Sequence, residues 1–259
     1  MFYWHHSLEK AREEVNSWVE DATNGLVKSL LPPGSLDEDT KLVFANALYF
    51  KGDWATAFNP YATQERDFHL LDGRNARVPF MSSIALQLVE WFHSLETPIR
   101  RRPEYVFLPH QRNALHNLMQ RVSSDIGFLD GYLRVQKMNL RESWLPKFKI
   151  TFDFEASTVM KELGLSSPFL PLGEFEDMVD MVVPLAKKLH VSKIQHVASV
   201  EVNEGGTEAA AAAGAVFIPQ QYVPPGEFVA DHPFMFMIRE DGSGSILFMG
   251  TVIDPSKDA

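Results

Sequence analysis

The chain has 259 residues, 45% of them apolar and 12% aromatic, which supports a large buried core and excludes a disordered chain. The net charge of −10 argues against nucleic-acid binding, and the absence of cysteine excludes disulfides, thiolate catalysis and cysteine metal sites. No run predicts a membrane span, and Met1–His6 lacks the features of a signal peptide.

Hydrophobic periodicity predicts an α+β chain forming one domain, 1–259, with more strands than helices. Apolar residues at helical spacing predict a first helix over Lys10–Leu31, which is ended by Pro32 and Pro33. The nearly continuous apolar run Lys41–Phe50 predicts a strand that is buried on both faces. The turn signal Asp72-Gly73, between two short strand patterns, predicts a hairpin.

The rest of the chain continues with short strands and a few helices. Further strands are predicted at Glu104–Leu108, Leu133–Leu140, Phe148–Phe152, Leu189–Val202, Phe234–Arg239 and Ile246–Val252. Helices are predicted over Leu115–Val122 and Val159–Leu163, and Ser166–Lys188 is expected to be irregular.

A segment with five consecutive alanines, Ala209–Ala213, follows the long strand Leu189–Val202. Alanine is the strongest helix former and Thr207 is a suitable N-cap, so one interpretation is a short helix or a linker. Side chains this small also fit between two β-strands without a clash. The other interpretation is therefore a spare strand that lies outside its sheet.

The usual motifs for catalysis and for metal binding are missing. The sequence has no Gly-x-Ser-x-Gly, no phosphate-binding glycine-rich loop and no His-Glu-x-x-His, and its nine histidines are scattered. We therefore expect a protein that is not an enzyme and that holds no metal and no cofactor.

Five separated motifs resemble those of the serpin family, in particular the plant serpins. They are Leu42–Trp54, Leu145–Ile150, Glu204–Ala212, Phe228–Phe234 and Ile246–Gly250. Trp18, Asn24 and Gly25 also fit the family's helix that crosses the main sheet. The resemblance covers nearly the whole chain and implies a serpin-like α+β fold with a large central β-sheet.

The resemblance implies a suicide-substrate inhibitor of serine endopeptidases. A protease cleaves the reactive-centre loop, and the freed segment inserts as a new strand of the main sheet. In this sequence the loop would span about 204–227, and Leu42–Phe50 and Leu189–Val202 would flank an empty slot that receives it. The partner would be a serine endopeptidase, and the protein would be a monomer that binds neither nucleic acid nor a membrane.

The resemblance also assigns site residues. The hinge would comprise Glu204, Gly205, Gly206, Thr207, Glu208, Ala209, Ala210, Ala211 and Ala212. Counting along the loop places the reactive bond at Gln220–Gln221, with Phe217, Ile218 and Tyr222 as alternatives. Asn46, Trp54 and His196 would support insertion. No basic residue lies in the loop, so a trypsin-like target is disfavoured.

The chain departs from the family pattern in three places. Several helices and two sheet strands that serpins carry before the first predicted helix are missing, which would leave Leu42–Phe50 as an unprotected edge. Ile84–Pro103 fits the family strands poorly, because the basic triplet Arg100–Arg102 stands where a hairpin is expected. Gly205 stands where an acidic residue is usual.

From the missing strands we expect an N-terminally truncated, non-inhibitory serpin that is at most a protease substrate or an interaction protein. The alternative is a functional inhibitor of chymotrypsin-like or elastase-like enzymes. Serpins occur both in the cytosol and outside cells, so the resemblance leaves the compartment open.

Overall fold

The computed structural model describes residues 8–51, 54, 57–83, 87–90, 92–99, 102–125, 128, 137–138, 140–172, 175, 189–205, 226–240 and 243–257. The chain divides into two compact units. Unit 1 comprises Met1–Phe50 and Ile150–Val200, and unit 2 comprises Lys51–Lys149 and Glu201–Ala259. The single domain expected from the sequence stays a prediction.

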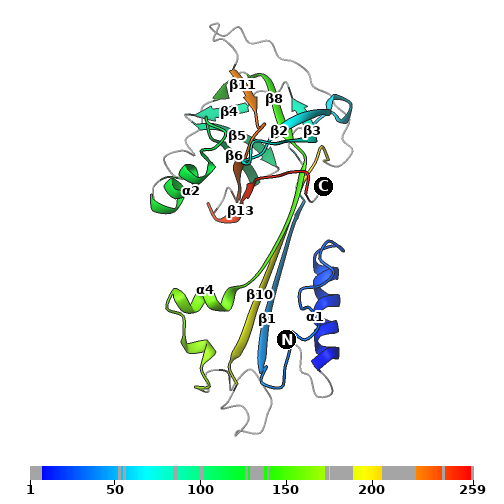
Figure 1. Ribbon diagram of the computed structural model, residues 1–259, viewed down its shortest axis with the longest axis vertical. Helices are drawn as coiled ribbons and strands as arrows, with labels where there is room; N and C mark the ends of the chain where they lie inside the picture. The colour runs from blue at the N-terminus through cyan, green and yellow to red at the C-terminus, as the bar shows by residue number, and fades with distance from the viewer. Residues whose placement is uncertain are drawn as a thin grey trace. The chain divides into compact units, whose positions relative to one another are not determined.

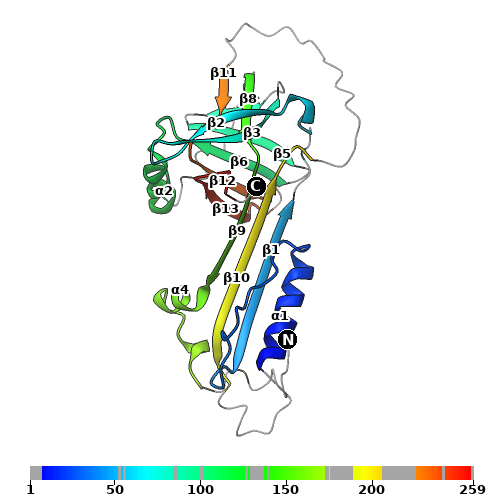
Figure 2. The same cartoon turned by 45° about the vertical axis from the view of Figure 1, so that its right-hand side comes forward.

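Unit 1 is built on a three-stranded sheet with the strand order β1-β10-β9. Its strands are β1 (Leu42–Lys51), β10 (Val191–Val202) and β9 (Phe148–Glu155). Helix α1 (Leu8–Ala22) lies alongside β1 in both ribbon views, and α4 (Ala156–Glu162) continues directly from β9 (Figures 1 and 2). A short 3-10 turn, η2 (Ser167–Phe169), follows α4.

The core of unit 1 lies between α1 and one face of this sheet. The buried cluster consists of Ala11, Val15, Val19, Val27, Leu30, Leu31, Leu36 and Val197, with Val43, Ala45 and Ala47 packed against it. Side chains alternate along a strand, so Phe44 and Leu48 of β1 point to the opposite face, where they are 37% and 38% exposed. The expectation that this strand is buried on both faces is therefore wrong for the described part of the chain.

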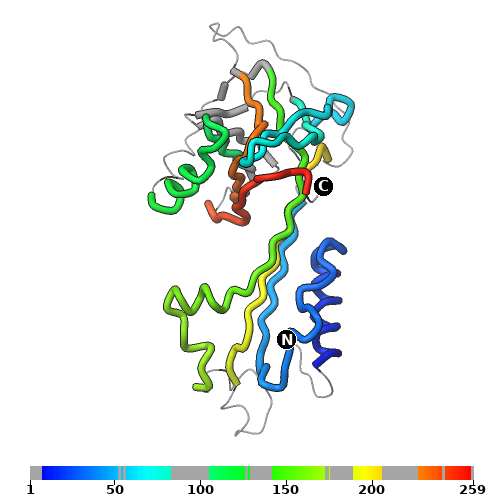
Figure 3. The backbone as a smooth tube through the Cα atoms, in the orientation of Figure 1, coloured from blue at the N-terminus to red at the C-terminus, as the bar shows by residue number. Residues whose placement is uncertain are grey.

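The first helix is shorter than its periodicity predicts, because α1 ends at Ala22 rather than at Leu31. Asn24 and Gly25 take positive φ values of 53° and 78°, and the Gly25 N–H donates to Glu20 O at 2.8 Å, which closes the helix end. Figure 3 shows the chain then turning back along the helix toward the start of β1. The apolar residues after Gly25 still reach the core, but from this returning segment.

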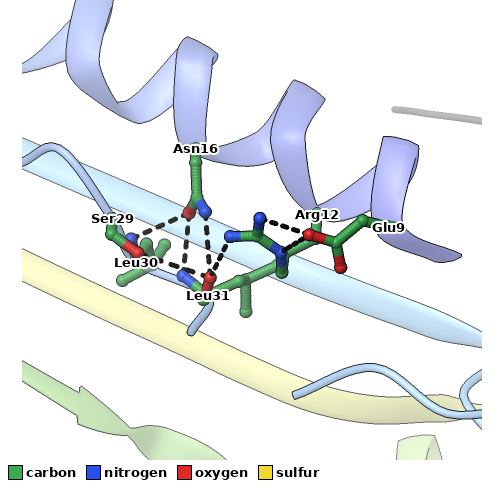
Figure 4. A network of polar contacts seen from close by, with 6 residues as sticks. All are labelled: Glu9, Arg12, Asn16, Ser29, Leu30 and Leu31. Atoms are coloured by element: carbon green, nitrogen blue, oxygen red, sulfur yellow. Dashed lines mark hydrogen bonds and ion pairs between the residues drawn. The ribbon is translucent and has the colours of Figure 1, made fainter. Parts of the chain in front are cut away.

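The returning segment is fixed to α1 by one buried side chain, Asn16 (Figure 4). Its Oδ1 accepts from the N–H groups of Leu30 and Leu31 at 2.9 and 2.8 Å. Its Nδ2 donates to the carbonyl oxygen of Leu31 at 2.9 Å, and Arg12 donates to the same oxygen. A non-helical segment in the core needs such partners, since buried backbone groups without them cost free energy.

Unit 2 contains a four-stranded sheet and a six-stranded sheet. The first has the order β11 (Gly226–Val229), β8 (Leu140–Pro146), β3 (Asn75–Ser83), β2 (Gln64–His69). The second has the order β13 (Ile246–Val252), β12 (Phe234–Arg239), β6 (Arg102–Leu108), β5 (Phe92–Ile99), β4 (Gln87–Glu90), β7 (Lys137–Met138). The other elements are α2 (Leu115–Ser124) and η1 (Pro60–Ala62).

Two predicted turns of unit 2 can be compared with the structure. The hairpin around Asp72-Gly73 is confirmed, with β2 and β3 antiparallel and Gly73 at φ 83°. The segment Ile84–Pro103, expected to fit the family strands poorly, contributes β4, β5 and the start of β6, and β5 pairs with β6 through Ile99 and Arg102. Of the strand predicted at Leu133–Leu140, residues 133–136 and 139 lie outside the described residues.

The core of unit 2 includes a cluster in which α2 packs on the six-stranded sheet. It comprises Tyr105, Phe107, Leu115, Leu118, Phe128, Met235 and Met237. Three side chains between β11 and the start of β12 are also fully buried, since Phe228, Ala230 and Phe234 are each 0% exposed. These side chains hold the segment in the interior of unit 2.

Candidate functional site: the β1–β10 pair and the hinge base

The two strands that are expected to flank the empty slot, β1 and β10, are direct neighbours. β1 and β10 are hydrogen-bonded to each other in the three-stranded sheet, and their arrows point the same way in Figure 2. The expectation of an empty slot between them is therefore wrong, because the two strands are already paired. Backbone groups left unpaired inside a sheet are costly, which favours closure while no third strand is present. Insertion of a strand here requires this pair to separate.

The side-chain contacts between β1 and β10 show that the two strands are parallel. Ser192 Oγ accepts from the Lys41 N–H at 2.8 Å, Asn46 Nδ2 lies 3.2 Å from His196 Nδ1, and Lys51 Nζ donates to Glu201 Oε1 at 3.1 Å. The contacting residues are 151, 150 and 150 positions apart in the chain. A constant separation means that both strands run in the same direction.

Asn46 and His196, two of the predicted supports for insertion, lie at the middle of this parallel pair of strands. Asn46 shares the sheet face of Phe44 and Leu48, opposite the residues that pack on α1. The ring of Phe154 from β9 meets the His196 ring edge-on, with centroids 5.5 Å apart. The two polar groups bond to each other within an otherwise apolar surface. Their predicted part in insertion stays a prediction.

Trp54, the third predicted support, lies in unit 2 at the end of β10. Its indole N–H donates to the carbonyl oxygen of Asn203 at 2.5 Å. Its ring packs edge-on against the ring of Phe58, with centroids 5.2 Å apart. Trp54 is 7% exposed. It therefore holds the backbone where the chain leaves β10 toward the loop. We use the name hinge base for Glu201–Gly205 together with the side chains that contact it.

Glu204, the first predicted hinge residue, is held by two side chains from unit 2. Thr63 Oγ1 donates to Glu204 Oε1 at 2.6 Å, and Lys147 Nζ lies 2.8 Å from Oε2. Burial raises the pKa of Glu204, but the hydrogen bonds from Lys147 and Thr63 outweigh it, so this pKa lies below its ordinary value of 4.5. The carboxylate is therefore ionised and bound to Lys147 at neutral pH.

Gly205 follows Glu204 in a tight turn. Its N–H donates to Asn203 Oδ1 at 2.8 Å, which is the hydrogen bond of an Asx turn. A Cβ at this position would lie 2.8 Å from that same oxygen, so the Asn203 side chain would have to move for any larger residue. Glycine in place of the family's usual acidic residue thus accommodates the Asn203 turn.

Sequence reasoning did not single out Thr63, Lys147 or Asn203, although all three contact the hinge base. Lys147 lies within the motif Leu145–Ile150. Its charge next to an apolar strand pattern was the one feature of the sequence that could have identified it as a contact residue. Thr63 and Asn203 are small polar residues in turns, and only the folded chain brings Thr63 to Glu204. The remaining hinge residues, Gly206–Ala212, lie outside the described residues, as do Gln220, Gln221 and the alternatives Phe217, Ile218 and Tyr222.

Metal-binding and membrane-spanning features are absent from the part of the chain that the structure describes. No group of three or more histidine, aspartate or glutamate side chains there is placed to hold a metal ion. Among the same residues, no helix has the length and apolar character needed to cross a membrane.

Comparison with known proteins agrees with the motifs. The family model described as "Serpin (serine protease inhibitor)" matches residues 5–255, and the chain belongs to the serpin family. Wheat (Triticum aestivum) Serpin-Z1A is 45% identical over 253 residues, and Arabidopsis thaliana Serpin-ZX is 46% identical over 256 residues; each alignment covers 93% of this chain. They cover 63% and 65% of the two relatives.

The fold is that of the serpins as well. The solved structure of Arabidopsis AtSerpin1, described as the native stressed conformation, superimposes with a TM-score of 0.81 at 41% identity. The match covers 95% of this chain and 65% of that structure. The expected serpin-like α+β fold is confirmed, and the chain spans about two thirds of the length of the relatives it matches.

Proposed function

We propose that this protein inhibits serine endopeptidases by inserting its reactive-centre loop between β1 and β10. The observation that carries this proposal is the parallel pairing of β1 with β10, followed directly in the chain by the hinge base. A segment that leaves the end of β10 and folds back is antiparallel to both strands. It therefore donates and accepts hydrogen bonds on both of its edges.

The contacts across the β1–β10 pair favour this exchange of partners. Within unit 1 the side-chain contacts that separation breaks include the single bonds Lys41 to Ser192 and Asn46 to His196. An exposed or half-exposed hydrogen bond of this type contributes only about 0.5–1.5 kcal/mol. An inserted strand of small residues such as Ala209–Ala213 would replace the lost bonds with a full ladder on each side.

The proposed partner is a serine endopeptidase that cleaves after an uncharged residue. The reactive bond is assigned to Gln220–Gln221 by its distance from Glu204 along the chain, and no lysine or arginine lies between Glu208 and Gly226. A protease with a carboxylate in its specificity pocket gains nothing from such a loop, so chymotrypsin-like and elastase-like enzymes are favoured. In this role the chain is cleaved and does not itself catalyse a reaction.

A second candidate function is that of a protease substrate that does not inhibit. The observation that favours it is the exposed side of the sheet in unit 1. Among the described strands β1 pairs only with β10, and its apolar residues Phe44 and Leu48 are more than one third exposed. Inhibition requires a sheet that stays intact while β1 and β10 separate, and an edge strand with few partners offers little resistance to unfolding.

The two candidate functions predict different products when the protein is incubated with a protease. The protein is mixed with chymotrypsin or elastase and analysed on denaturing gels, and its melting temperature is measured before and after cleavage. A covalent band at the summed mass together with a large rise in melting temperature supports the inhibitor. Cleavage near Gln220 without the band and without the rise supports the substrate.

A further inference from the structure

Unit 2 contains a group of charged side chains that the proposed insertion does not use. Asp231 and His232 follow β11, and β11 is the strand that follows the loop. Asp231 Oδ2 lies 3.4 Å from Arg112 Nη2 and 3.5 Å from His69 Nε2. We call these four residues the Asp231 cluster.

His232 is the buried member of the Asp231 cluster, at 6% exposed. Its Nδ1 lies 2.7 Å from Asp231 Oδ1 and its Nε2 lies 2.7 Å from the carbonyl oxygen of Pro109. A carbonyl oxygen and a carboxylate can only accept hydrogen bonds. Both ring nitrogens must therefore carry hydrogen for the two bonds to exist together, and a ring with both hydrogens is a cation.

Asp231, beside His232, is itself surrounded by groups that favour its ionised form. Burial raises the pKa of Asp231, but the hydrogen bond and charge of His232, together with Arg112 and His69, outweigh it and leave that pKa below its ordinary value. Asp231 is thus an anion with three charged or titratable neighbours. They are His232 from the same segment, His69 from β2 and Arg112 from the turn before α2. His69 Nδ1 in turn lies 2.9 Å from Asn75 Oδ1.

The backbone around the Asp231 cluster ties β11 to two other strands. The Ala230 N–H donates to Trp144 O of β8 at 2.9 Å, and the His69 N–H of β2 donates to Asp231 O at 2.7 Å. The side chains of Phe228 and Ala230, on either side of Val229, are fully buried. The position of Asp231 therefore determines where the chain beyond the loop is fixed.

We propose that His232 is a proton-dependent positioning residue, which fixes the end of β11, and with it the C-terminal attachment of the reactive loop, only while both ring nitrogens carry hydrogen. The reference to a reactive loop rests on the proposed function; the dependence of β11 on the His232 proton does not. Loss of that proton removes the His232 donor from either Pro109 O or Asp231 Oδ1.

The direction of the pH dependence follows from the charges. The bond from His232 to Asp231 needs a cation and an anion, so it is complete where the carboxyl is ionised and the ring is protonated. It is lost when the ring gives up one of its two N–H hydrogens as the pH rises. It also weakens under strongly acidic conditions, where Asp231 takes up a proton.

The test is amide hydrogen exchange of the intact chain without protease, at a series of pH values from 5.5 to 8.5. Protection factors, which correct for the intrinsic pH dependence of exchange, are followed for the N–H groups of Ala230 and His69. We expect both to fall about tenfold or more across this range. Constant protection would overturn the proposal. Because protease is absent, a failure of inhibition leaves this result unaffected.

Two variants and one control sharpen the test. Asp231→Asn removes the anion that favours the charged ring, and His232→Gln removes the titrating group, so in both the fall in protection should disappear. His116→Gln changes an exposed histidine on α2 and should leave the fall unchanged. A fall that persists in His232→Gln would assign the effect to another group and contradict the proposal.

A direct measurement on the wild-type protein does not depend on either variant folding. Nitrogen-15 NMR of the ring shows whether both nitrogens of His232 carry hydrogen at pH 6. Two protonated nitrogens are expected, and a single protonated nitrogen at that pH would overturn the proposal.

Discussion

The side-chain amide of Asn46 in β1 lies 3.2 Å from Nδ1 of His196 in β10, across the pair of strands that the proposed loop insertion would separate. The two residues are 150 positions apart in the chain, and their contact joins β1 to β10. It is one of the few side-chain bonds described between these strands. Its removal is therefore a direct way to weaken the β1–β10 pair.

We expect Asn46→Ala to weaken the β1–β10 pair by about 0.5–1 kcal/mol, the low end for a hydrogen bond, because Asn46 is exposed to solvent. The amides of β1 and β10 should exchange faster. Hydrogen exchange measured by NMR checks this effect. Asn113→Ala, at an exposed position before α2, is the matched control. Equal exchange in the two variants would show that the Asn46–His196 bond has no part in closing the sheet.

Asn16→Ala should destabilise unit 1 by about 3 kcal/mol, because the N–H groups of Leu30 and Leu31 would be left buried without a partner. Exchange at these two amides should rise together with a lower midpoint of urea unfolding. Asn16→Asp keeps the acceptor but places a carboxylate oxygen against Leu31 O in place of the donor, so it should destabilise the unit as well. Glu9→Ala removes an exposed ion pair on the same helix and should change little.

Lys147→Met should loosen the hinge base, since Glu204 would keep only Thr63 as a side-chain partner among its described contacts. The expected cost is about 1 kcal/mol, because Lys147 is partly exposed to solvent. It would appear as faster exchange of the Gly205 amide. Arg77→Met removes an exposed ion pair in the same unit and is the control. Protection of Gly205 that does not change would show that Lys147 does not hold the hinge.

The pH dependence of the hinge base follows from Glu204. Its pKa in the folded protein is below 4.5, so the bond to Lys147 contributes fully above about pH 5.5 and is lost as the pH falls through the folded value. We expect exchange at Gly205, corrected for its intrinsic rate, to increase below about pH 4.5 in the wild type. In Glu204→Gln it should be raised already at pH 7 and should not depend on pH over this range. The same acid response in both proteins would rule out Glu204 as its cause.

Thr207→Arg should abolish insertion of the loop while leaving its cleavage intact. The family resemblance places Thr207 toward the interior of the sheet after insertion, where an unpaired charge would cost several kcal/mol. Glu208→Arg introduces an arginine at a neighbouring position that would face solvent, and it serves as the control. The readout is the rise in melting temperature after cleavage, which the control should show and Thr207→Arg should lack. A rise in both variants would contradict the assigned alternation.

Local patterns in the sequence predicted those parts of the fold that depend on a few neighbouring residues. The hairpin at Asp72-Gly73 and the strands β12 and β13 are where the pattern of apolar residues and turn residues places them. The first helix was predicted too long, because the residues after Gly25 are apolar at helical spacing but reach the core from a returning segment. Periodicity reports which side chains are buried, and it does not report which backbone conformation buries them.

The order of the residues by itself determined the family and the presence of a segment of small side chains after the long strand. Whether β1 and β10 stand apart or together was decided by the folded chain, because backbone hydrogen bonds close a sheet wherever no third strand fills it. The same holds for the contacts of Glu204 with Thr63 and Lys147 and of His232 with Pro109. These contacts join residues far apart in the chain, and only tertiary packing brings such donors and acceptors within bonding distance.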